Sequence, residues 1–278
     1  MSIRKTMLML AALGCAAALS AAPAAATAPT IKGKITTQDG VSRSGEIRWS
    51  AKEKAYLTTR KAGATMIDEI TKPEDVAEMD IEKPAQWDAI VKAVEAGKGV
   101  SVQKRLEAIV KDYAHLQWDK SAGRYLAQTY VMSGNYDKAL AVCRDIIAND
   151  ETAAYAGDLA PMYWQALLKK GQNAKLEAAI KKAIATGDRY SSGAALIMRG
   201  DMEVEGKAGD RDAAMRALQD GYMRVVLLYT DEGVAGKLRP EAMSKAAKCF
   251  ETLGQAPRAA DLRGQLRAQY ADSPWNGR

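Results

Sequence analysis

Histidine is nearly absent from this chain, since His115 is the only one among 278 residues. One histidine cannot build a histidine-paired nucleophile, an HExxH zinc site or a two-histidine metal site. His115 lies in a segment with helical periodicity that has to pack, which favours a structural role. We therefore expect no enzyme, and neither a metal nor another cofactor.

Cysteine is also scarce, and no CxxC pair occurs. Cys143 and Cys249 allow two interpretations. They could form a disulfide that closes a loop of roughly 105 residues, or each could be a small buried apolar residue. The second is favoured for Cys143, which follows Ala139 by one helical turn. A reactive thiol needs a basic, exposed neighbourhood, and Arg144 alone does not supply one.

Long apolar runs are missing. The run Met7–Leu19 has thirteen residues, too few to span a membrane comfortably, which takes about 20. Arg4 and Lys5 precede it and small residues follow it, as in a secretory signal peptide. We expect residues 1–26 to be removed and the protein to be exported to the periplasm or cell envelope. Cys15 leaves a lipoprotein, anchored at this cysteine, as the alternative.

A concentrated charge of one sign is missing too. The net charge of +6 falls to +4 over 252 residues once Arg4 and Lys5 leave with the signal peptide, because 6 − 2 = 4 and 278 − 26 = 252. A mildly basic chain without a clustered basic patch does not predict nucleic-acid binding.

Residues 31–84 show the period-two alternation of β-strands. Short turn-prone links separate the strand patterns, and a proline-led acidic turn, "TKPEDV" (71–76), precedes the last one. Five short strands with a helical turn before the fifth resemble a small SH3-like or Sm-like barrel in topology. We expect residues 27–84 to form such a β-barrel domain.

After Pro84 the periodicity becomes helical. "AQWDAIVKAVEAGK" places its apolar residues on one stripe, and "VQKRLEAIVKDYAHLQW" repeats that pattern. The two segments predict a degenerate leading helical hairpin over residues 85–118.

The segment "AGRYLAQTYVMSGNYDKALAVCRDIIAND" (122–150) resembles a tetratricopeptide (TPR) repeat. Leu126 and Ala127 supply a large and then a small residue in the first helix, and Tyr130 follows one turn later. Gly134 provides the turn, where a residue tolerant of positive φ is needed, and Ala139 opens the second helix.

The same plan recurs with turn glycines at 134, 171, 209 and 254, spaced 37, 38 and 45 residues apart, against about 34 in TPR proteins. We therefore predict a mainly α protein, in which a TPR-like α-solenoid of helical hairpins over 119–278 follows the small all-β barrel-like domain. The resemblance is to TPR proteins of the exported, periplasmic type.

The resemblance implies a concave groove lined by the first helix of each hairpin. The residues carried over to the inward positions are Arg124, Gln128, Met132, Gln165, Lys169, Asp201, Glu205, Lys248 and Glu251. Their change from basic to acidic to mixed argues against a groove built for one C-terminal carboxylate.

The resemblance implies an exported scaffold that binds a protein or peptide partner in the envelope of a Gram-negative-type bacterium. An alternative is a peptidoglycan- or polysaccharide-binding module, in which the β-domain and Trp49 recognise the polymer and the TPR array oligomerises. A third, weaker possibility is a hydrolase with carboxylates in the groove.

Overall fold

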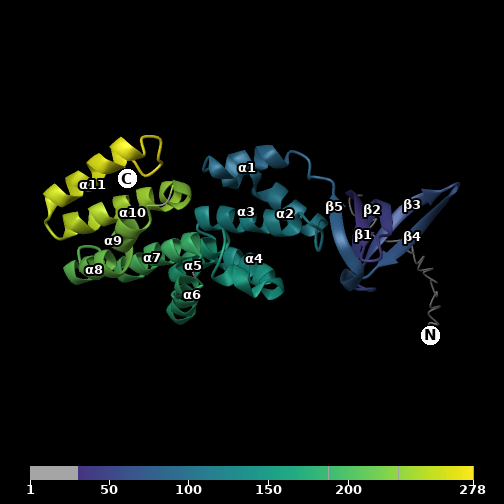
Figure 1. The fold of residues 1–278 in the computed structure, drawn as a ribbon, viewed down its shortest axis with the longest axis horizontal. Coiled ribbons are helices and arrows are strands. Elements are labelled where there is room, and N and C mark those ends of the chain that lie inside the picture. Colours follow the sequence, from purple (N-terminus) through teal and green to yellow (C-terminus); the bar gives the residue numbers. More distant parts are fainter. Residues whose placement is uncertain (1–30, 187, 231, 278) are drawn as a thin grey trace, which may run out of the picture.

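The computed structural model describes residues 31–186, 188–230 and 232–277. The expected signal peptide and Cys15 lie outside the described residues, as does the start of the expected β-domain, residues 27–30. The described chain is elongated, with a β-sheet at one end and helices along the rest (Figure 1). The strands are β1 (Ile31–Thr37), β2 (Ser42–Ser50), β3 (Ala55–Ala62), β4 (Thr65–Thr71) and β5 (Val76–Ile81).

The sheet is open, so the predicted barrel is wrong. Its strands are antiparallel in the order β4-β3-β2-β1-β5, and within the described residues no pairing joins β4 to β5. The short 3₁₀ turn expected before the last strand is present at Pro73–Asp75. Closing a barrel requires both edges to meet, but here the apolar face is covered by another part of the chain.

That cover comes from the loop between the second and third helices. Ile35 and Ile47 of the sheet are buried in one cluster with Leu116 of this loop. Trp118 Nε1 donates a hydrogen bond to the Ile81 carbonyl at 2.9 Å, and the Ile81 N–H donates to Gln117 Oε1 at 3.2 Å. The sheet therefore obtains its core partly from the helical region.

The helical region contains eleven α-helices in the described residues. They are α1 (Trp87–Glu95), α2 (Gln103–Asp112), α3 (Asp119–Met132), α4 (Tyr136–Asn149), α5 (Ala160–Lys169), α6 (Asn173–Ala185), α7 (Arg189–Val204), α8 (Arg211–Ala217), α9 (Met223–Leu228), α10 (Glu232–Thr252) and α11 (Ala256–Gln269). None of these helices has the length and apolar character needed to cross a bilayer.

The helices from α3 onward stack as successive hairpins. Helix α3 packs on α4, α5 on α6, α7 on α8, and α10 on α11. The first helices also contact one another in order, α3 with α5, α5 with α7, and α7 with α10. The predicted turn glycines 134, 171, 209 and 254 have φ values between 64° and 79°, a region that only glycine enters readily.

A π-helical turn, Leu218–Tyr222, joins α8 to α9. It brings the Tyr222 ring against Gly200 of α7, where an added Cβ would lie 2.5 Å from the ring. Gly200 therefore lets the Tyr222 side chain lie fully buried between α7 and α10.

Helix α10 contains a proline in its interior. It runs from Glu232 to Thr252 and includes Pro240. Proline is more typical of a first helical turn, so this position is unusual. The helix lies against α7 and α11.

Candidate functional site: a groove across three helices

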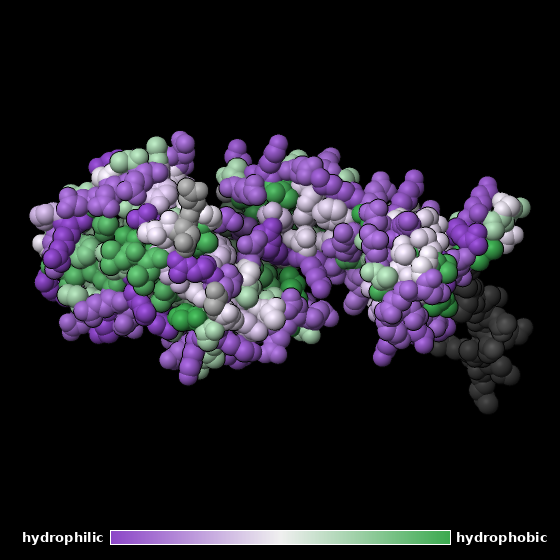
Figure 2. All heavy atoms as spheres, viewed as in Figure 1, coloured by the Kyte–Doolittle hydropathy of each residue, from purple (hydrophilic) through white to green (hydrophobic). Residues whose placement is uncertain are grey.

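A cavity of about 580 Å³ lies where α5, α7 and α10 run side by side. We call it the central groove. Hydrophobic side chains gather over the α7–α10 part of the molecule, with polar ones around them (Figure 2). The lining comprises Pro161, Met162, Gln165, Leu168 and Lys169 of α5; Tyr190, Ala194, Ile197, Met198, Asp201 and Val204 of α7; Glu205, which follows α7; Lys237, Leu238, Glu241 and Lys245 of α10; and Trp275.

The floor of the groove is apolar. Leu168 from α5, Ala194, Ile197 and Met198 from α7, and Leu238 from α10 are all buried. Ile197 and Met198 lie three and four positions after Ala194, so both neighbour it on one side of α7. The floor thus combines single faces of three helices that are distant in the sequence.

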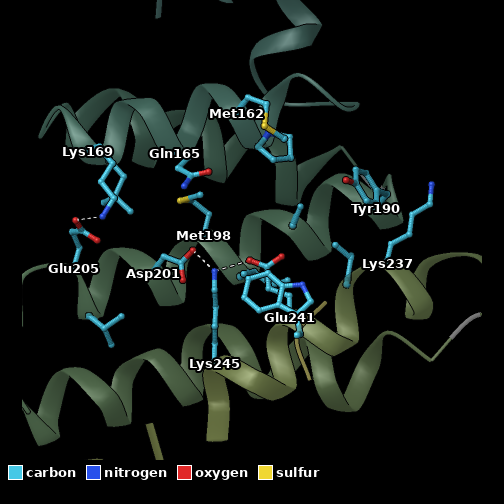
Figure 3. Close-up of a pocket in the computed structure, with 17 residues that line it drawn as sticks. Met162, Gln165, Lys169, Tyr190, Met198, Asp201, Glu205, Lys237, Glu241 and Lys245 are labelled. Carbon is cyan, nitrogen blue, oxygen red and sulfur yellow. Dashed lines mark hydrogen bonds and ion pairs between the residues drawn. The ribbon is translucent and has the colours of Figure 1, made fainter. Parts of the chain in front are cut away.

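Lys245 lies at the centre of the polar lining (Figure 3). Its ammonium is 2.7 Å from Asp201 Oδ2 on α7 and 2.6 Å from Glu241 Oε1 on its own helix. Burial lowers the pKa of Lys245, but the charges and hydrogen bonds of Asp201 and Glu241 outweigh it and raise the pKa. Lys245 is therefore held protonated between two carboxylates.

Tyr222 holds Asp201, one member of this cluster, through a hydrogen bond. Its hydroxyl donates to Asp201 Oδ1 at 2.7 Å. Burial, followed by the negative charge of Asp201, raises the pKa of Tyr222. Asp201 is thus fixed from two sides, by a buried phenol and by the ammonium of Lys245.

A second ion pair crosses the groove between α5 and the end of α7. Lys169 Nζ lies 2.6 Å from Glu205 Oε1, and both side chains are more than a third exposed. An exposed pair of this kind stabilises the fold little, by roughly 0–1 kcal/mol. Its charges are therefore available to a bound molecule at small cost.

Tyr190 and Lys237 form the far end of the groove. Lys237 Nζ lies 5.6 Å from the centroid of the Tyr190 ring, within range of a cation–π contact. Burial and then the charges of Asp158 and Glu241 raise the pKa of Tyr190.

Four of the nine residues predicted to face the groove line it together: Gln165, Lys169, Asp201 and Glu205. They come from α5, α7 and the residue after α7.

The three α3 residues do not line the central groove. Arg124 donates to Asp158 Oδ2 at 3.0 Å, and its guanidinium covers the Tyr125 ring. Gln128 is half-buried and Met132 is exposed.

The two predicted α10 residues do not line the central groove either. Lys248 is exposed outside the groove, and Glu251 pairs with Arg263 of α11, with Arg263 Nη2 3.1 Å from Glu251 Oε2. Lys237, Glu241 and Lys245 take their place. Their spacing of four residues places them on one face of α10.

A second cavity, of about 660 Å³, lies between the sheet and the helices. Asp119 lines this cavity. Its carboxylate accepts hydrogen bonds from the backbone N–H groups of His115 and Lys120, and burial raises the pKa of Asp119. The His115 ring stacks on Trp49 with centroids 4.4 Å apart. Trp49 is therefore half-covered, and its contact does not favour a role as an open polysaccharide platform.

The two cysteines in the described residues, Cys143 and Cys249, are free and buried. Burial raises the pKa of Cys143 to about 12 and that of Cys249 to about 11. The interpretation as two separate apolar residues is confirmed, and the disulfide alternative is wrong. In the described part of the chain, no group of three or more His, Cys, Asp or Glu side chains could hold a metal ion.

No protein-family model, curated protein or solved structure matches this chain.

Proposed function

We propose that this chain is an exported scaffold protein that binds a peptide segment or helix of a partner protein in the central groove. The observation that carries the proposal is the pairing of an apolar floor with a rim of both charges. Three lysines (169, 237 and 245) and three carboxylates (201, 205 and 241) border the cavity.

An amphipathic segment matches such a surface, because it can bury its apolar face on the floor while its polar flanks meet charges of either sign. The balance of three lysines and three carboxylates argues against a site for a single carboxylate or phosphate. The stacked hairpins and glycine turns resemble a TPR array, whose groove serves peptide recognition.

The proposed role is binding rather than catalysis. The single histidine and both cysteines of the mature chain are absent from the groove lining. Lys169 pairs with Glu205, and Lys245 pairs with Asp201 and Glu241, at 2.6 to 2.7 Å. This arrangement is suited to exchanging partners with a bound chain.

The same proposal places the mature protein in the cell envelope. Its support is the pattern of Arg4 and Lys5 followed by the apolar run Met7–Leu19. Mass spectrometry of the mature N-terminus after expression in a bacterial host should find Thr27, whereas an acylated Cys15 would establish the lipoprotein alternative.

Peptide binding is tested by panning a displayed peptide library on the wild-type chain. The groove variant exchanges an ion pair, Lys169→Glu with Glu205→Lys. The matched control exchanges the pair Lys182–Glu151, 2.7 Å apart and outside the groove, as Lys182→Glu with Glu151→Lys.

Enriched peptides should bind the wild type and the control exchange equally, and the groove exchange about tenfold more weakly, since tenfold corresponds to about 1.4 kcal/mol. Failure to enrich any peptide, or equal binding to all three proteins, would contradict the proposal.

A further inference from the structure

The C-terminal turn also contributes to the groove. Among the described residues of the lining, Trp275 alone neither belongs to α5, α7 or α10 nor directly follows one of them. Trp275 lines the central groove, and the ammonium of Lys245 lies 5.7 Å from the centroid of its ring. Trp275 is half-buried and packs against the edge of the helical core. An aromatic ring from this chain therefore already contacts the centre of the proposed binding surface.

The turn that carries Trp275 is formed by local hydrogen bonds. Ser273 N–H donates to the Tyr270 carbonyl at 3.0 Å, and the Trp275 N–H donates to Ser273 Oγ at 3.2 Å. The Asn276 side-chain amide donates to the carbonyls of Tyr270 and Ala271 at 2.7 and 2.8 Å. These bonds lie within the turn and hold its shape.

The base of the turn is anchored more firmly. The Tyr270 hydroxyl accepts a hydrogen bond from Arg239 of α10 at 3.1 Å, and Arg239 also donates to the Val226 carbonyl at 3.2 Å. The tail is thus tethered at Tyr270, five residues before the ring that enters the groove. A short tether of this kind keeps the ring at a local concentration on the order of millimolar.

We propose that Trp275 is an internal ligand of the central groove, and that the natural partner segment displaces it with an aromatic side chain of its own. The inference rests on the proposed function and names the chemistry of its ligand. The incoming ring takes the position beside Lys245, where the ammonium contributes a cation–π contact. The flanking residues of the partner then meet the ion pairs of Asp201, Glu241 and Glu205.

The test adds the tail in trans to full-length variants. The probe is a fluorescently labelled peptide with the sequence of residues 270–277, YADSPWNG, and binding is measured by fluorescence anisotropy. With the internal ring removed in Trp275→Ala, the peptide should bind about tenfold more tightly than to the wild type, because a ligand at millimolar local concentration no longer competes. The same peptide with alanine at the tryptophan position should not bind.

Two further variants separate displacement from a merely structural role of the ring. Trp275→Phe keeps an aromatic ring in the groove and should bind the peptide as weakly as the wild type. Asn276→Ala removes two hydrogen bonds of the turn but keeps the Trp275 ring, and it should bind the peptide with intermediate affinity. This variant also tests the inference if Trp275→Ala does not fold.

The inference is overturned if the peptide binds wild type and Trp275→Ala equally, or if neither folded Trp275→Ala nor Asn276→Ala binds it. Its failure is distinguishable from that of the proposed function. Library peptides that need the groove but lack aromatic residues would refute the inference alone. If the tail peptide binds Trp275→Ala but no library peptide is enriched, Trp275 is still an internal ligand and the proposed binding of a partner peptide is refuted.

Discussion

At the scale of single residues, burial decides the chemistry of the groups that looked reactive in the sequence. Cys143 is fully buried in a small cluster with Ala127 and Leu159. The thiolate is disfavoured there because the charged form loses its hydration. The motif around Gly134 and Cys143 is therefore a packing unit rather than a nucleophile.

Cys143 should consequently resist alkylation in the folded protein. At pH 8, iodoacetamide should label Cys143 and Cys249 only slowly, since burial raises their pKa values to about 12 and about 11 and the thiolate is the nucleophile. Peptide mapping by mass spectrometry measures each site, and labelling in denaturant is the control. Rapid labelling of Cys143 in the folded chain would restore the reactive interpretation.

Tyr222 should couple stability to alkaline pH. Its pKa is raised in the folded protein above the ordinary 10.0, so its contribution is complete below pH 10 and is lost as the pH rises further. The slope from this group reaches about 1.4 kcal/mol per pH unit. Denaturant unfolding of Tyr222→Phe should show a free energy lower by about 1–3 kcal/mol at pH 8, because Asp201 loses a buried partner, and a flatter decline above pH 10. An unchanged alkaline slope would contradict the role assigned to Tyr222.

At the scale of elements, glycines set where helices turn and how closely they approach. Gly134 has a φ of 73° in the turn between α3 and α4, whereas Gly264 lies inside α11, where an added Cβ would have no neighbour within 4 Å. The same substitution should therefore have opposite effects at these two positions.

Gly134→Ala should lower the unfolding free energy by about 1–2 kcal/mol, the cost of placing a side chain in the left-handed region. Gly264→Ala should raise it by about 0.5–1 kcal/mol, because alanine is the better residue in a helix interior. Thermal and denaturant unfolding of both variants measure the difference. Equal effects would show that the Gly134 turn is not conformationally required.

At the scale of the whole molecule, the sheet and the helical stack share a boundary. The bonds of Trp118 and Gln117 to Ile81 and the burial of Leu116 against the sheet join the two parts. A small open sheet gains stability when a helix or loop packs on its hydrophobic face. Here the loop around Leu116 does so.

Weakening this boundary should release the sheet first. Trp118→Phe keeps the ring but removes the hydrogen bond to Ile81, at a cost of about 1–3 kcal/mol. In limited trypsin digestion, cleavage after Lys52 and Lys54, in the exposed turn between β2 and β3, should accelerate while the helices persist. Arg263→Ala, at the other end of the molecule, is the control and should leave this cleavage unchanged.

Much of the element pattern was accessible from the sequence, because strand alternation and turn glycines are local signals. Gln165, Lys169, Asp201 and Glu205 were found because the turns at Gly171 and Gly209 fixed their register. Lys245 and Glu241 were missed because the inward positions implied by the TPR resemblance fell on Lys248 and Glu251 of the same helix. Trp275 could not be placed, since no local pattern tells where a tail docks.

The sequence by itself therefore determined the order of strands and helices, the hairpin turns and the inertness expected of Cys143. Each follows from backbone sterics or from hydrophobic spacing over a few residues. Only the tertiary structure decided that the sheet stays open, that Trp49 stacks on His115, and that Lys245 joins Asp201 beside Trp275. These features depend on contacts between elements that are distant in the sequence. The stabilising free energy comes from packing two such elements together, so no single segment predicts it.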